Sequence, residues 1–155
     1  MRCPAAVHTA GHGAHTDETK ENDTMGKKLR TMRVRGSVPE AISLLHQLLA
    51  DRGVEVLASI DHAAGARRAG LMLAEEMVVF FGNPATGTGV MQDDPRAGID
   101  LPLRIVFWDD NGTTYAAYRD PQELADDFDL VDHHDVPAKL SKFMTALTSD
   151  LRAEQ

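Results

Sequence analysis

The most constraining feature of this sequence is an unbroken apolar run, Met77–Phe81, that stops at the tripeptide Gly82–Pro84. A short apolar run bounded by turn residues is typical of a strand that is buried on both faces or lies inside a sheet. Two further glycines, Gly87 and Gly89, follow closely. We therefore expect a central strand that leads into a glycine loop, Gly82–Gly89, where a small domain would place a binding site.

Size and charge limit the classes of protein to which this chain can belong. The chain has 155 residues, of which 43% are hydrophobic, and this suits one domain with a core of its own. Asp and Glu number 24 against 16 Lys and Arg, which gives a formal net charge of -8. Affinity for nucleic acid and for anionic membrane surfaces comes largely from Lys and Arg, so we expect neither partner.

The sequence contains no signal for secretion or membrane insertion. Cys3 is the only cysteine, so no internal disulfide can form. No segment approaches the roughly 20 consecutive apolar residues of a membrane span. The start of the chain also lacks the apolar stretch of a secretory signal. We therefore expect a cytoplasmic protein.

Residues 1–30 are predicted to be a disordered N-terminal tail, because they offer no periodic apolar positions to bury. His8, His12 and His15 have a spacing at which imidazoles can coordinate a transition metal. Without a helix to hold them on one face, a solvated tail is the simpler interpretation, and we predict no metal site. Met25 precedes Gly-Lys-Lys and resembles a natural beginning, so it is an alternative translation start.

The remaining residues, 31–151, alternate between strand and helix patterns. In order, the first half predicts a strand through Met32 and Val34, a helix from Ser37 to near Gly53, a strand over Val54–Ile60, a short helix within Ala63–Ala74 and the strand Met77–Phe81. The second half predicts one helical turn around Val90 and Met91, followed by the strands Leu103–Trp108 and Thr113–Tyr118, which the turn Asp109–Gly112 joins. A short helix over Pro121–Phe128 and a long helix over Pro137–Leu151 follow. We predict a single α+β domain, in which a β-α-β4-α antiparallel sheet has two long helices packed on one face, with short helical inserts.

Short motifs along the chain resemble those of one protein family. They are Ile60–Asp61, Phe81–Pro84, Thr88, Met91, Leu101–Pro102 and Tyr118–Pro121. Together they are similar to the domain-of-unknown-function family numbered 302. The resemblance implies a fold like that of the TATA-binding protein and the formation of homodimers, but no established activity and no catalytic residues. Some relatives have Cys directly after the Leu-Pro pair; Leu103 stands there in this chain, so no thiol chemistry is carried over.

The glycine loop is the first candidate site. Gly82 and Gly87 match the two glycines of a phosphate-binding P-loop, but Thr88 stands where that motif has its lysine. The charge that would meet the phosphates is missing, so a turn built from glycines and Asn83-Pro84 is the simpler interpretation. We retain a weaker prediction, that Asn83 and Thr88 offer hydrogen bonds to a ligand.

Two other clusters combine carboxylates with imidazoles. The pair Asp61–His62 has groups for acid–base chemistry, but neighbours on a strand point to opposite faces. A helix cap or structural hydrogen bond is therefore the simpler role for Asp61, and His62 is expected at the surface. Residues Asp132–Asp135 include metal-ligating types, but four adjacent residues cannot all converge on one ion. We expect a solvated linker, with Asp135 near the start of the last helix.

These observations predict a small-molecule-binding or regulatory domain that acts as a homodimer, and they predict no cofactor. The predicted ligand-binding residues are Asp61, Asn83, Thr88, Met91 and Tyr118. Two alternatives stay open. One is an enzyme of unknown class that uses Asp61 and Asn83 in a small pocket. The other is a protein interaction module in which the apolar strand and Trp108 form a subunit interface.

Overall fold

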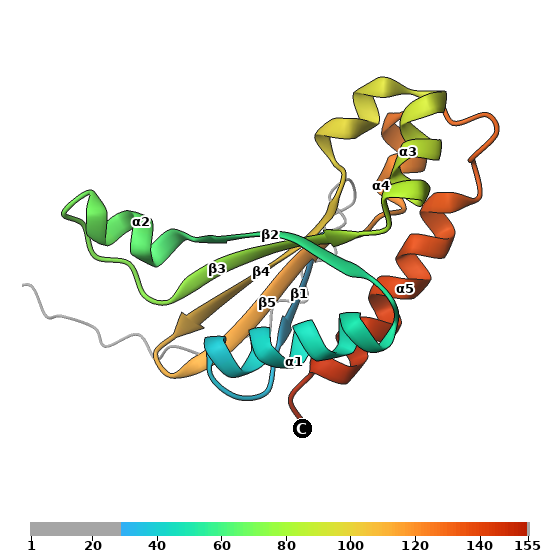
Figure 1. Ribbon diagram of the computed structural model, residues 1–155. Coiled ribbons are helices and arrows are strands. Elements are labelled where there is room, and N and C mark those ends of the chain that lie inside the picture. Colours follow the sequence, from blue (N-terminus) through green and yellow to red (C-terminus); the bar gives the residue numbers. More distant parts are fainter. Residues whose placement is uncertain (1–28, 155) are drawn as a thin grey trace, which may run out of the picture.

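Five strands form one antiparallel sheet in the computed structural model, which describes residues 29–154 (Figure 1). They are β1 (Leu29–Arg33), β2 (Glu55–Asp61), β3 (Glu76–Gly82), β4 (Leu103–Asp110) and β5 (Thr113–Arg119). Their order across the sheet is β1-β5-β4-β3-β2, and every neighbouring pair is antiparallel. The apolar run Met77–Phe81 lies in β3, which is paired on both sides.

Helices occupy the connections and the C-terminal part of the chain. They are α1 (Val38–Asp51), α2 (His62–Arg68), α3 (Pro84–Asp93), the 3-10 helix η1 (Pro95–Ile99), α4 (Glu123–Asp127) and α5 (Val136–Leu151). The two long helices, α1 and α5, lie on the same face of the sheet, with α5 reaching from α3 down to α1 (Figure 1). The predicted α+β class and the order β-α-β4-α with short inserts are thus confirmed.

Helix α1 begins where the sequence predicts it. The Ser37 hydroxyl accepts a hydrogen bond from the Glu40 N–H at 3.4 Å, and the Glu40 carboxylate accepts one from the Ser37 N–H at 2.7 Å. This reciprocal pair is a capping box, and Pro39 fits the first turn beside it. The hydrogen bonds from Ser37 also hold the pKa of Glu40 below its usual value.

The core lies between one sheet face and the helices α1 and α5. Because side chains alternate across a strand, every second residue of the central strands points to this core. Val79 and Phe81 of β3 and Ile105 and Phe107 of β4 are completely buried there. The long helices leave the opposite sheet face uncovered.

Two boundaries differ from the sequence-based expectation. Strand β1 begins at Leu29, two residues earlier than expected, while the remaining tail residues, with His8, His12, His15 and Met25, lie outside the described part. The helix expected within Ala63–Ala74 ends at Arg68. Gly70, with φ of 74°, turns the chain out of the helix, as glycine commonly does at a helix end.

Candidate functional site

The stretch predicted as a glycine loop is a helix, so this prediction was wrong. The Asn83 side chain accepts a hydrogen bond from the Ala85 N–H at 3.0 Å, and Pro84 stands in the first turn. Asn before a helix and Pro at its first position both favour helix initiation. Consequently α3 starts directly after β3 and runs over ten residues, of which the expected turn around Val90 and Met91 is only a part.

A cavity of about 560 Å³ lies beside α3. Its wall is mostly apolar and comes from the start of α3, the segment Leu101–Leu103, β2 residue Leu57 and one face of α5. A few polar side chains interrupt this wall. A largely apolar concavity of roughly 300–1,000 Å³ with a few polar groups is the usual form of a small-molecule site.

Helix α5 divides its apolar stripe between the core and the cavity. Its second half is buried in the core through Met144, Leu147 and Leu151. Its first half lines the cavity with Val136, Lys139, Leu140 and Phe143, whose spacing places them on one helix face. One helix therefore stabilises the sheet and forms a wall of the site.

The structure brings together only part of the predicted site. Asn83, Thr88 and Met91 all line the cavity. Tyr118 instead belongs to the core and is 8% exposed. Asp61 is absent from the cavity wall, because it pairs with Met77 at the far end of β3.

This arrangement contradicts the alternative of an enzyme that uses Asp61 and Asn83 together in one pocket. Gly82, which precedes Asn83, pairs with Glu55, six positions from Asp61 on β2. At about 3.3 Å per residue, the two side chains are separated by roughly 20 Å along the sheet. Asp61 has the structural role that the sequence favoured: its carboxylate accepts the Ala64 N–H at 2.7 Å and caps α2.

His133, which was expected in a solvated linker, lies in the cavity wall. Its Nδ1 lies 3.1 Å from Asp93 Oδ1, and its backbone N–H donates to Asp93 Oδ2 at 2.8 Å. The Val131 N–H donates to the same oxygen at 3.0 Å. Burial raises the pKa of Asp93, but these hydrogen bonds outweigh it and hold the pKa below its usual value.

The imidazole of His133 also lies against α3. A Cβ added at Gly89 would be only 2.7 Å from His133 Nε2, so the ring occupies space that any larger residue would fill. The rest of the predicted linker is exposed, and Asp135 stands directly before α5 as expected. Gly89 thus serves close packing of helix and ring.

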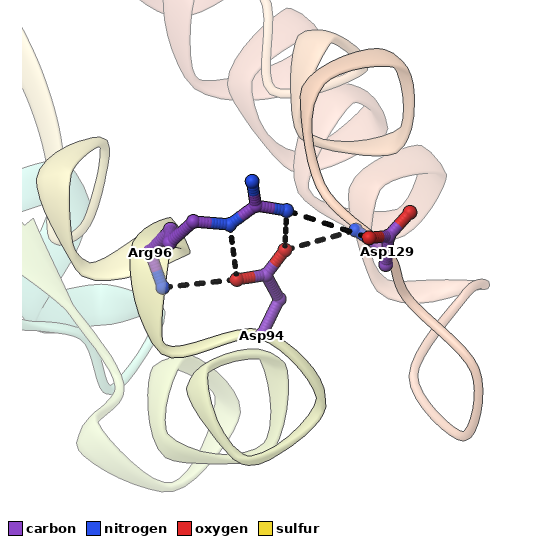
Figure 2. A network of polar contacts seen from close by, with 3 residues as sticks. All are labelled: Asp94, Arg96 and Asp129. Atoms are coloured by element: carbon purple, nitrogen blue, oxygen red, sulfur yellow. Dashed lines mark hydrogen bonds and ion pairs between the residues drawn. The ribbon is translucent and has the colours of Figure 1, made fainter.

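Asp94, at the end of α3, also holds the loop that contains His133 (Figure 2). Its carboxylate is 5% exposed and accepts hydrogen bonds from the Arg96 N–H, from Arg96 Nε and Nη2, and from the Asp129 N–H. The Arg96 guanidinium, followed by the Asp129 N–H, holds the pKa of Asp94 far below its usual value. Asp93 and Asp94 therefore anchor the loop 129–133 beside the cavity.

A second, much smaller cavity, of about 30 Å³, lies beside Asp120. This volume holds little more than one water molecule. Burial raises the pKa of Asp120, but hydrogen bonds from Ser141, the Gln122 N–H and Arg30 lower it further than burial raises it. The Asp120 carboxylate therefore has partners within the protein, and one of them, Arg30 Nη2, lies 3.2 Å from its Oδ2.

No group of three or more His, Cys, Asp or Glu side chains among residues 29–154 is placed to hold a metal ion. No helix in the same range is both long and apolar enough to cross a membrane.

A solved structure shares this fold. The crystal structure of an uncharacterized conserved DUF302 protein from Bacillus stearothermophilus superposes with a TM-score of 0.72. The match covers 81% of this chain and 98% of the other, at 22% sequence identity. It supports the α+β fold and carries no functional information.

Sequence relatives and a family model place the chain in a family. A protein from Brucella suis named Fluoride-specific ion channel FluC 1 is 38% identical over 112 residues, which are 72% of this chain and 44% of that protein. A FluC 1 protein from Brucella abortus is equally similar, with 42% of its length covered. The chain thus spans less than half the length of these relatives. The family model described as "Domain of unknown function DUF302" matches residues 30–147, and the protein belongs to this family.

Proposed function

We propose that this protein is a small-molecule-binding domain whose site is the cavity between α3 and α5. The observation that carries the proposal is a cavity of about 560 Å³ with a mainly apolar wall. Asn83, Thr86 and Thr88 supply hydrogen-bonding groups on the α3 side. Size and wall chemistry suit an organic molecule better than a small ion, which needs charged or polar partners throughout.

Filling the cavity tests this proposal. Thr88→Trp places a large ring in the site, whereas Gln92→Trp adds the same ring at an exposed α3 position outside the cavity wall. Native mass spectrometry of the purified proteins should show a bound small molecule in the wild type and in Gln92→Trp, and its loss in Thr88→Trp. Equal occupancy in all three proteins would contradict the proposal, as would the absence of any binder from both co-purification and a fragment screen.

A regulatory role for the bound molecule has one observation in its favour. In the two Brucella relatives, which are named as ion channels, the matching region makes up 44% and 42% of the protein. There the domain is joined to a further segment, as ligand-sensing domains commonly are.

We propose further that the domain acts as a homodimer through the uncovered sheet face. Ile60, Val78, Val106 and Ala117 are cross-strand partners and therefore form one apolar row on this face. Ile60 is 48% exposed although it is apolar. An uncovered apolar sheet face commonly packs on a second sheet.

Sedimentation velocity tests the dimer. Ile60→Asp introduces a charge into the apolar row, and Val131→Asp introduces one at a loop residue that is 73% exposed and away from the sheet. At micromolar concentration we expect a dimer for the wild type and Val131→Asp, and a monomer for Ile60→Asp. A monomeric wild type would contradict this part of the proposal without affecting the cavity.

A further inference from the structure

The cavity wall lacks the carboxylates that dominate the rest of the chain. Overall, 24 Asp and Glu residues outnumber 16 Lys and Arg residues. Among the described residues that line the cavity, however, none is Asp or Glu, while Lys139 and His133 are both present. In such an acidic protein, a wall that includes a lysine ammonium and lacks carboxylates favours a ligand with a negative charge.

Lys139 stands at the solvent edge of this wall. It shares the α5 face with Leu140 and Phe143, and its side chain is 73% exposed. Its Nζ lies 2.6 Å from Asp135 Oδ2, in an ion pair whose carboxylate is 51% exposed. Exposed pairs at this helical spacing contribute little to stability, and the ammonium has three donors. Lys139 is therefore available to a second carboxylate at little cost.

The other polar groups of the wall are suited to a supporting role. The Nδ1 of His133 is already engaged with Asp93, which leaves the imidazole in a fixed position along the wall. Thr86 and Thr88 add uncharged hydroxyl groups from α3. The remainder of the cavity wall is apolar and suits the hydrocarbon body of a ligand. The wall therefore has a polar edge and an apolar interior, and we expect its ligand to be amphipathic too.

We propose that the ligand is an amphipathic organic acid, with its apolar body between α3 and α5 and its carboxylate on Lys139. This inference rests on the proposed function of the cavity and adds the chemical class of its ligand. Asp135 is then the internal competitor of the ligand carboxylate, because both pair with the same ammonium.

Three probes with the same ten-carbon chain test the charge preference: decanoate, decanol and decyltrimethylammonium. Their dissociation constants are measured by calorimetry on the wild type and on Lys139→Met. Lys142→Met is the matched control, because Lys142 is an exposed lysine of α5 outside the cavity wall. Asp135→Asn removes the competing carboxylate.

For the wild type and Lys142→Met we expect decanoate to bind about fivefold more tightly than decanol, since an exposed ion pair contributes up to about 1 kcal/mol. Lys139→Met should abolish this preference and leave decanol binding unchanged, while Asp135→Asn should tighten decanoate alone. Equal binding of decanoate and decanol to the wild type would overturn the inference and leave the proposed function standing. Binding of none of the probes overturns the inference, whereas the Thr88→Trp experiment decides the proposed function independently.

Discussion

At the scale of single residues, two glycines of α3 have different surroundings. A Cβ at Gly87 would make ordinary contacts of 3.9 Å with Leu101 and Met91, whereas a Cβ at Gly89 would meet His133 Nε2 at 2.7 Å. Gly87→Ala should therefore raise the free energy of unfolding by up to about 1 kcal/mol through helix propensity. The free energy of unfolding of Gly89→Ala should be about 1–3 kcal/mol lower than that of Gly87→Ala, because the His133 ring must move.

Urea unfolding of the two variants measures this difference. The pair is internally controlled, since both variants add the same methyl group to the same helix. Equal stabilities would show that His133 gives way at no cost. In that case the contact between the ring and Gly89 would not fix the cavity wall.

Asp94 gives the fold a predictable sensitivity to acid. Its hydrogen bonds hold its pKa below the ordinary value of 3.8, so its ionised form stabilises the folded state. This contribution is complete above the unfolded-state pKa and is lost as the pH falls through the folded-state pKa. Asp94→Asn should therefore have a lower urea midpoint at pH 7, and its deficit relative to the wild type should shrink below about pH 4.

An exposed aspartate provides the control for this measurement. Asp132→Asn changes the same charge in the same part of the molecule but at an exposed position. Its midpoint at pH 7 should stay close to that of the wild type. A deficit of Asp94→Asn that is constant from pH 7 to pH 2 would mean that the ionised carboxylate does not stabilise the loop.

At the scale of elements, the start of α3 depends on one side chain. Asn83 Oδ1 is the acceptor for the Ala85 N–H, and replacement of such a cap by Ala costs about 0.5–2 kcal/mol. Asn83→Ala should therefore lower the unfolding free energy by about 1 kcal/mol, while Asn83→Asp, which keeps an acceptor, should stay near the wild type. Thermal and urea unfolding check both variants, and equal losses would exclude a capping role.

The same element shows why ligand binding and stability must be separated. Asn83 both lines the cavity and caps the helix that forms its wall. Loss of binding in Asn83→Ala would therefore not identify a ligand contact. Thr88 makes a cleaner probe, because it lines the cavity from an exposed position within the helix.

At the scale of the whole molecule, stability should come from the single core that joins the sheet to α1 and α5. Leu45 of α1 is completely buried in it, whereas Leu71 is 65% exposed. Leu45→Ala should cost about 2–5 kcal/mol because it leaves a cavity. Leu71→Ala should change the unfolding free energy by less than about 0.5 kcal/mol. Chemical denaturation compares the two, and similar losses would mean that the segment after α2 is packed in solution.

Much of the fold was predictable because its signals are local. The apolar run of β3, the capping box at Ser37 and the stripe of α5 each specify their element within a few residues. The alternation of strands and helices then limits the architecture to α+β. Local signals gave a wrong prediction for α3. Three glycines suggested a loop, but the pair Asn83-Pro84 initiates a helix.

The sequence by itself determined the order of the elements, the interior position of β3 in the sheet and the structural role of Asp61, since these depend on periodicity and capping between near neighbours. Only the tertiary structure decided the composition of the site. It separates Asp61 from Asn83 by the length of a strand and places Tyr118 in the core. It also brings His133 to Asp93 across forty positions of sequence. Antiparallel pairing and helix packing set these distances, and both join residues whose separation along the chain carries no local signal.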